Sequence, residues 1–231
     1  MIAGIVAAQR GAATGGDPLW ANVVALLRFG GANGSTSFTD EKGHTFNPVG
    51  NAQISTAHGS PYATSMILDG VGDFLTSANV ADWSFGTGDF CAEAILRQNA
   101  GTQTGDKGLF CVAINGGLSV GLQGGKLFCG PVDVSYGPIA STAIAVDTYT
   151  HVAAWRTGGT VRVAHGGVIL ASAADTYNYA QGVLGIGASS SNGYSTNTAN
   201  LAGFIGVARL TKGASRYGTA NFTPPTSFPN S

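Results

Sequence analysis

The amino-acid sequence predicts an all-β protein in which two antiparallel sheets pack face to face as a β-sandwich. Short apolar segments rich in β-branched residues recur along the 231 residues, and Gly pairs or Asn-Gly steps separate many of them. Such steps suit the tight turns of β-hairpins. No long segment shows a helical period with caps, and no internal repeat is present. Many short strands at near-regular spacing are typical of a sandwich or jelly roll.

The clearest strand pattern lies in residues 65–98. Met66 to Asp69 and Asp73 to Ser77 form two short strands around a Gly turn, and a long strand starts at Asp89. Alternation with a period of two predicts that this long strand separates two different environments. One face carries Phe90, Ala92, Ala94 and Leu96, and the other carries Cys91, Glu93, Ile95 and Arg97.

Residues before this stretch also form strands. The dense apolar run 19–29 predicts a strand buried on both faces, and residues 39–43 form a turn between Phe38 and Phe46. A short strand follows at 51–55.

Residues after it continue the same pattern. A single helical turn is expected at 212–217, and the tail from residue 221 contains three prolines, so it cannot continue a sheet. We expect one sandwich domain over 18–231. Its further strands are predicted at 107–114, 118–123, 126–129, 132–136, 150–157, 160–164, 168–172, 183–187 and 202–211.

Composition excludes several classes of protein. Charged residues are only 10% of the chain and the net charge is −1, so no basic field is present to bind nucleic acid or an anionic membrane. The N-terminus lacks a basic segment, and its apolar stretch is too short to span a bilayer. This predicts no secretion signal and no membrane insertion. Cys91, Cys111 and Cys129 lack metal-ligand spacing and predict buried free thiols, typical of a reducing compartment.

Residues 1–17 are expected to form an N-terminal arm outside the sandwich. Ile2, Ile5 and Val6 are apolar, and a loose Gly-rich stretch follows them. Such an arm can dock on a neighbouring subunit, so these three residues are our candidates for assembly. A frayed terminus is the alternative.

Five segments together carry a resemblance to a known family. They are DPLWANVVALLRF, GSTSFTDEKGHTF followed by GNAQIST, LDGVGDFL with FGTGDF, THVAAWRTGGTV, and RLTKGASRYGTANFTPP. In this order the chain resembles the concanavalin A-like, laminin-G-type jelly-roll domains of bacteriophage and prophage structural proteins. The resemblance covers about residues 17–229 and leaves the arm outside.

The resemblance implies a place in a virion, assembled in the host cytoplasm. It implies a role as a capsid decoration, tail fibre or other tail component, with other virion proteins as partners and a homo-oligomer as the expected state. It also implies carbohydrate binding in host attachment.

Two departures from the family pattern argue against a metal site. The chain has Phe29-Gly30-Gly31 and Ile205-Gly206-Val207-Ala208-Arg209 where relatives often have acidic residues. Ca²⁺ needs about six to eight oxygen ligands. Asp40, Asp69 and Asp73 could supply some, but such residues usually form turns. We therefore expect no cofactor and no metal, with Ca²⁺ as the doubtful exception.

Enzymatic chemistry finds little support in the residues. A glycosidase needs two carboxyl groups flanking one bond, but the chain has only two glutamates and no strand that groups acids on one face. Glu93 is expected to face solvent or to pair with an arginine. His151 is expected to pack or hydrogen-bond, and no Gly-x-Ser-x-Gly motif is present. We predict that the protein is not an enzyme.

Glycan binding would use aromatic rings and amide side chains. The polar segment 189–200 suits a binding rim, whereas Trp20 and Trp155 are expected in the core. The main hypothesis is a non-enzymatic phage virion protein, and the alternative is an adhesin that recognises host glycans. The candidates for the glycan rim are Trp83, Tyr177, Tyr179, Asn192, Tyr194 and Asn197, with Tyr136 as a further aromatic residue.

Overall fold

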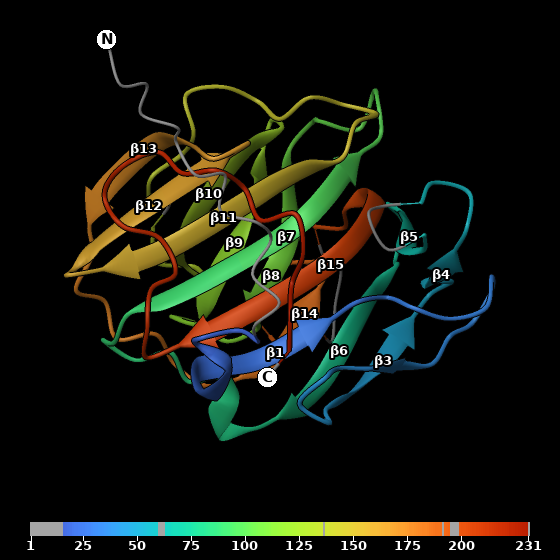
Figure 1. Cartoon of the computed structure of the whole chain (residues 1–231), viewed down its shortest axis with the longest axis horizontal. Helices are drawn as coiled ribbons and strands as arrows, with labels where there is room; N and C mark the ends of the chain where they lie inside the picture. The colour runs from blue at the N-terminus through green and yellow to red at the C-terminus, as the bar shows by residue number, and fades with distance from the viewer. Residues whose placement is uncertain (1–15, 60–62, 136, 191, 195–198, 231) are drawn as a thin grey trace, which may run out of the picture.

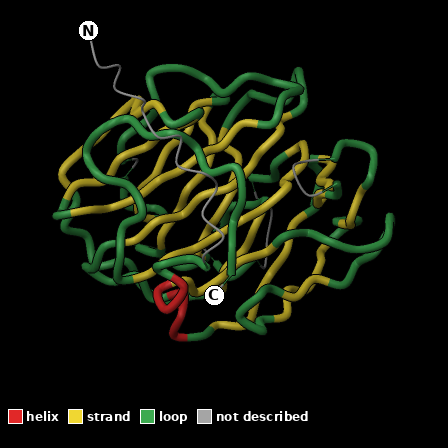
Figure 2. Tube along the Cα trace, viewed as in Figure 1, coloured by secondary structure: helices red, strands yellow, loops and turns green. Residues whose placement is uncertain are grey.

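The predicted β-sandwich is confirmed by a computed structural model. It describes residues 16–59, 63–135, 137–190, 192–194 and 199–230. Within these residues, fifteen strands form two antiparallel sheets, and the only helices are two short 3-10 turns, η1 (Trp20–Asn22) and η2 (Ala81–Trp83). Figure 2 shows the strands stacked in two layers with loops around them. None of the described helices has the length and apolar character needed to cross a membrane.

The front sheet faces the viewer in Figure 1. Its long central strands β7 and β15 are paired along almost their whole length. The strand β1 (Val23–Leu27) pairs with β15 on the side away from β7. The order across the rest of the sheet is β13 (Val168–Ala174), β12 (Thr160–His165), β11 (Thr150–Thr157), β7 (Phe90–Gln98), β15 (Ala202–Lys212), β5 (Ser65–Asp69) and β4 (Gln53–Ser55).

The back sheet lies behind it (Figure 1). Hairpins connect β8, β9 and β10 in sequence, as their Gly turns predict. The order across the sheet is β10 (Lys126–Pro131), β9 (Leu118–Gln123), β8 (Asp106–Val112), β14 (Val183–Ile186), β6 (Phe74–Asn79), β3 (Thr45–Val49) and β2 (Phe38–Thr39).

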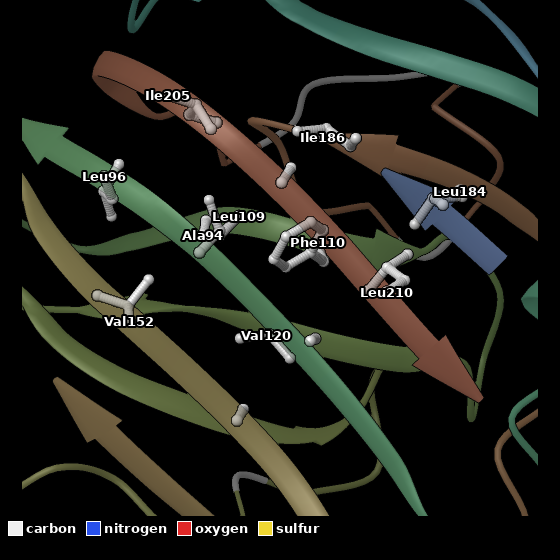
Figure 3. Close-up of a cluster of buried hydrophobic side chains, with 14 of the residues drawn as sticks. Ala94, Leu96, Leu109, Phe110, Val120, Val152, Leu184, Ile186, Ile205 and Leu210 are labelled. Carbon is white, nitrogen blue, oxygen red and sulfur yellow. The ribbon is translucent and has the colours of Figure 1, made fainter. Parts of the chain in front are cut away.

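The core fills the space between the two sheets (Figure 3). The predicted alternation of β7 is confirmed, because Phe90, Ala92, Ala94 and Leu96 all belong to this core. The residues between them face outward but are buried as well, because other parts of the chain cover the front sheet. The three cysteines are buried free thiols, also as predicted.

Three sequence predictions of local structure were wrong in detail. The run 19–29 starts with η1 before β1 begins at Val23. Residues 132–135 form a turn instead of a strand, because the chain turns at Asp133, which has φ 56°, directly after Val132 has exchanged backbone hydrogen bonds with Gly116 and Gly117. Residues 212–217 contain no helical turn, because β15 continues to Lys212 in register with β7.

The C-terminal segment 213–230 crosses the outer face of the front sheet as the red trace of Figure 1. It contains no strand, as its prolines predict. Tyr217 and Phe222 stack with ring centroids 3.7 Å apart. The indole of Trp155 donates a hydrogen bond to the carbonyl of Gly218 at 3.1 Å. The segment therefore covers apolar residues of the front sheet that would otherwise face water.

Candidate functional site

A cluster of buried charges lies under this C-terminal segment. Glu93 and Arg209 are direct neighbours across β7 and β15, and His151 comes from the adjacent β11. The Oε1 atom of Glu93 accepts a hydrogen bond from Nε of Arg209 at 2.8 Å. Its Oε2 atom accepts one from the Tyr217 hydroxyl at 2.6 Å and lies 2.9 Å from Nε2 of His151.

Asp17 extends the cluster to the other end of the chain. Its carboxylate accepts hydrogen bonds from Arg216 at 2.6 Å and from Arg209 at 3.1 Å. The side chain of Glu93 is 0% exposed, so its oxygens cannot reach a substrate from solvent. The expected pairing of Glu93 with an arginine is confirmed, as is hydrogen bonding by His151. The cluster fastens both chain ends to the front sheet, and its role is structural.

Acid should weaken this cluster. Burial alone would raise the pKa of Glu93, but the hydrogen bond from His151 and the charge of Arg209 lower it from 4.5 to about 2. Because the pKa of Glu93 is lower in the folded than in the unfolded state, its ionisation stabilises the fold at pH values above the unfolded-state pKa of about 4.5. This stability is lost as the pH falls from about 4.5 towards 2. Urea unfolding over an acidic pH series should show this decline, and Glu93→Gln should remove much of it. A wild-type stability that is flat or rises over this range would contradict the assignment.

A different part of the molecule carries an open pocket. This first pocket has a volume of about 580 Å³, within the range of roughly 300–1,000 Å³ that is typical of ligand sites. It lies on the outer face of the back sheet, on the side opposite the C-terminal segment. Its lining residues are Asp106, Lys107, Ser119, Phe128, Gly130, Pro131, Val132, Asp133, Val134, Ser135, Ser189, Ser190, Asn192 and Ala199.

Outward-facing residues of β9 and β10 form the floor of the first pocket: Ser119, Phe128 and Gly130. Ser119 and Gly121 alternate with core residues along β9, and Phe128 and Gly130 do so along β10. A Cβ atom on Gly121 would lie 2.9 Å from the ring of Phe128. Glycine at this position allows the aromatic ring to lie against the sheet, so that the ring leaves space in the pocket above it.

Two loops form the walls. One is residues 132–135, and the other is residues 188–190 with 192–194. Tyr194 holds the second wall down, because its hydroxyl donates to the carbonyl of Cys111 at 2.9 Å. A Cβ atom on Gly185 would lie 2.1 Å from that hydroxyl, so only glycine lets Tyr194 approach β14 this closely.

Each wall contains a non-glycine residue in the left-handed region. Asp133 has φ 56° and Tyr194 has φ 67°. Such a conformation costs about 1–3 kcal/mol and persists where the surrounding structure fixes it, often at functional sites. Both walls of the first pocket therefore turn at a residue whose backbone conformation favours glycine.

The first pocket offers hydrogen-bonding groups of both kinds. Asp133 and Ser135 are exposed on one wall, and Asn192 is exposed on the other. Lys107 supplies an ammonium donor, and Asp106 a carboxylate that also accepts from the Gln123 amide at 3.3 Å. Half-exposed Val134 adds apolar surface. This mixture can hold the hydroxyl groups and the C–H faces of a sugar.

The structure separates the predicted rim residues. Asn192 lines the first pocket, and Tyr194 anchors its wall. Tyr177 and Tyr179 lie at a second pocket described below, but the prediction of Tyr179 as a rim residue was wrong, because its side chain is 1% exposed in the core. The prediction for Trp83 was wrong: its ring is 0% exposed in the core, and its N–H donates to the Ala78 carbonyl. Tyr136, Asn197, Ile2, Ile5 and Val6 lie outside the described residues.

Sequence reasoning missed Asp133, Lys107 and Ser119. Asp133 was assigned to a strand, and nothing local in the sequence shows that it turns toward the pocket. Lys107 and Ser119 come from two adjacent strands, and it is the register of the hairpin that places both at the first pocket. Small residues at outward positions, Ser119 and Gly121 on one strand and Gly130 on the next, were the available signal for an outer face that leaves room for a ligand.

The aspartates considered for metal binding have turn roles. Asp40 and Asp69 each accept hydrogen bonds from backbone N–H groups a few residues further along the chain. Asp73 accepts from the backbone N–H groups of Asn51 at 2.7 Å and Asp69 at 3.0 Å. Among the described residues, no three His, Cys, Asp or Glu side chains are grouped closely enough to hold a metal ion.

Comparisons with solved structures identify proteins of the same fold. Domain 4 of AbnA, an extracellular arabinanase of Geobacillus stearothermophilus solved with arabinotriose, has 16% identity and a TM-score of 0.59, over 83% of this chain and 93% of that domain. The ligand-binding domain of botulinum neurotoxin serotype D, solved with N-acetylneuraminic acid, has 13% identity and a TM-score of 0.61, over 85% of this chain and 49% of that one.

Trypanosoma rangeli sialidase, solved with 2,3-difluorosialic acid, has 15% identity and a TM-score of 0.57. The match covers 83% of this chain but only 31% of the sialidase. This chain thus spans nearly all of the arabinanase domain, about half of the toxin domain and a third of the sialidase. No family model and no curated protein matches it. At these identities the comparisons show a shared β-sandwich fold.

Proposed function

We propose that the chain is a glycan-binding module and that the first pocket is its binding site. The observation that carries this proposal is an open hollow of about 580 Å³ lined by carboxylate, amide, ammonium and hydroxyl groups. Sugars present hydroxyl groups and apolar C–H faces, and this lining complements both. Two proteins of the same fold, the arabinanase domain and the toxin domain, were solved with sugars.

The charges of the first pocket favour a neutral sugar. Asp106 and Asp133 outnumber Lys107, and no arginine is among the lining residues. An anionic sugar would approach a net negative site without the bidentate arginine partner that carboxylates prefer. The proposed ligand is therefore a neutral glycan rather than a sialylated one.

A glycan screen tests this proposal. We expect immobilised neutral oligosaccharides, including arabino- and cello-oligosaccharides, to retain the protein, and sialyllactose to retain it less than lactose does. Because hydrogen bonds to neutral groups are screened little by salt, binding should change little with ionic strength. Retention of no neutral glycan would contradict the proposed function, and preference for sialyllactose would contradict the charge argument.

The module is proposed to bind without cleaving. The glutamate that sequence analysis weighed for a glycosidase, Glu93, is buried under the C-terminal segment. Prolonged incubation with a bound oligosaccharide should release no new reducing ends.

The location of the module on a phage particle stays a prediction. Its attachment to other virion proteins as decoration, fibre or tail component, and its homo-oligomeric state, rest on the sequence resemblance alone. A host-attachment role would be compatible with the proposed glycan site, since an adhesin needs the same binding surface.

A further inference from the structure

A second pocket adjoins the first. It has a volume of about 450 Å³ and shares Gly130, Pro131 and Ser135 with the first pocket. The rest of its lining comes from Cys129, Gly137 and Pro138 on the near side, and from residues 173–179, at the end of β13 and just after it, on the far side. The second pocket therefore lies at the side of the sandwich, just across residues 131–135 from the first.

The far wall of the second pocket is held rigidly by Asp175. Its Oδ1 atom accepts a hydrogen bond from the Tyr177 backbone N–H at 2.7 Å, and its Oδ2 atom accepts one from the Tyr179 hydroxyl at 2.7 Å. Buried Arg156 donates to the carbonyls of Tyr177 and Gly86 at 2.8 and 2.7 Å. These charged groups are engaged within the protein, so the wall needs no ligand to complete it.

The groups that remain available on this wall suit a sugar. Tyr177 is half-buried and packs against Tyr179 with ring centroids 5.4 Å apart. Thr176 and Asn178, on either side of it, are exposed and add a hydroxyl and an amide. An aromatic ring flanked by neutral hydrogen-bonding groups can stack on a sugar face and bind its hydroxyls. Of the aromatic residues predicted for a glycan rim, Tyr177 is thus placed to contact a ligand here, whereas Tyr179 is 1% exposed and supports the wall from the core.

We propose that the second pocket is a further subsite and that one linear neutral oligosaccharide crosses residues 131–135 to occupy both pockets. This inference rests on the proposed function of the first pocket. The shared residues form the ridge between the pockets, so neighbouring sugars of a chain can contact both sides of it. A disaccharide fills the first pocket alone, whereas longer chains gain the contacts of Tyr177 and Asn178.

Calorimetric titration with a ladder of arabino- and cello-oligosaccharides, from disaccharide to hexasaccharide, tests the inference. In the series that binds, affinity should rise with chain length. Tyr177→Ala should lower the affinity for the hexasaccharide about tenfold, equivalent to about 1.4 kcal/mol, and leave the disaccharide unchanged. The exposed Asn178→Ala variant should act in the same direction without any packing change.

The controls separate the two proposals. Asn192→Ala, in the first pocket, should weaken binding of short and long chains alike. If Tyr177→Ala and Asn178→Ala leave the hexasaccharide affinity unchanged, or weaken the disaccharide equally, the second subsite is wrong while the first stands. If the wild-type protein binds no member of either ladder, the proposed function fails together with the inference.

Discussion

Replacing Glu93 with alanine is expected to lower the free energy of unfolding by about 3–5 kcal/mol, the range for breaking a buried ion pair. The carboxylate receives hydrogen bonds from Arg209 and Tyr217 and lies against His151, and its side chain is 0% exposed. Without it, the guanidinium of Arg209 stays buried and keeps the carboxylate of Asp17 and the ring of Phe228 as neighbours. The C-terminal segment also loses one of its contacts to the front sheet.

The other glutamate of the chain is a matched control. Glu41 pairs with Arg28 at 2.9 Å and accepts an exposed hydrogen bond from Asn230 at 3.0 Å, and the side chains of Glu41 and Arg28 are 34% and 28% exposed. A surface pair of this kind contributes about 0–1 kcal/mol. Urea unfolding of Glu93→Ala, Glu41→Ala and the wild type should therefore give a large loss for the first and a small one for the second. Equal losses would show that the buried cluster does not hold the C-terminal segment as described.

Removing one polar group from each wall of the first pocket is expected to weaken glycan binding by about a hundredfold. Hydrogen bonds to a charged group contribute about 1.5–3 kcal/mol and neutral ones about 1 kcal/mol, and 1.4 kcal/mol corresponds to a tenfold change. The double variant combines Asp133→Gly with Asn192→Ala. Glycine accepts the φ of 56° at position 133, so the wall keeps its backbone conformation.

A remote acidic residue provides the control for this double variant. Asp82 lies on η2, 47% exposed, and contacts His44 rather than any pocket residue. Asp82→Ala should bind the glycan as the wild type does, and isothermal titration of all three proteins makes the comparison. A double variant that keeps its melting temperature and also keeps wild-type affinity would move the binding site away from this pocket.

The strands and turns could be predicted because their signals are local. The alternation in 90–97 and the Gly pairs between hairpins act within a few residues, and the structure follows both. The errors at 132–135 and 212–217 arose where the residue types alone do not decide the outcome. The first segment turns at Asp133, which has φ 56°, and β15 continues to Lys212 because β7 still pairs with it.

The candidate site could be predicted only in part. Asn192 was identified because a polar segment of that composition suits a rim. Trp83 was misassigned because a tryptophan near a turn looks the same in sequence whether its ring faces the core or solvent. Asp133 joins the pocket through an unusual backbone angle, and Lys107 and Ser119 through cross-strand register. Neither property is encoded by the residue type alone.

The burial of Glu93 was also beyond local reasoning. Its outward position on β7 predicts contact with solvent unless another segment covers the sheet. The covering segment lies more than a hundred residues away, where Tyr217 donates to the Glu93 carboxylate. A Pro-rich tail predicts the absence of a strand, but it does not predict the surface on which the tail lies.

Mapping the ligand on the protein tests the central claim most directly. Backbone amide signals of isotopically labelled protein, followed by NMR during titration with a neutral oligosaccharide that binds, report the contact surface residue by residue. We predict the largest shifts at residues 130, 132–135, 189–190 and 192, on the outer face of the back sheet. Shifts concentrated instead on the front sheet and the C-terminal segment would contradict the first pocket as the glycan site.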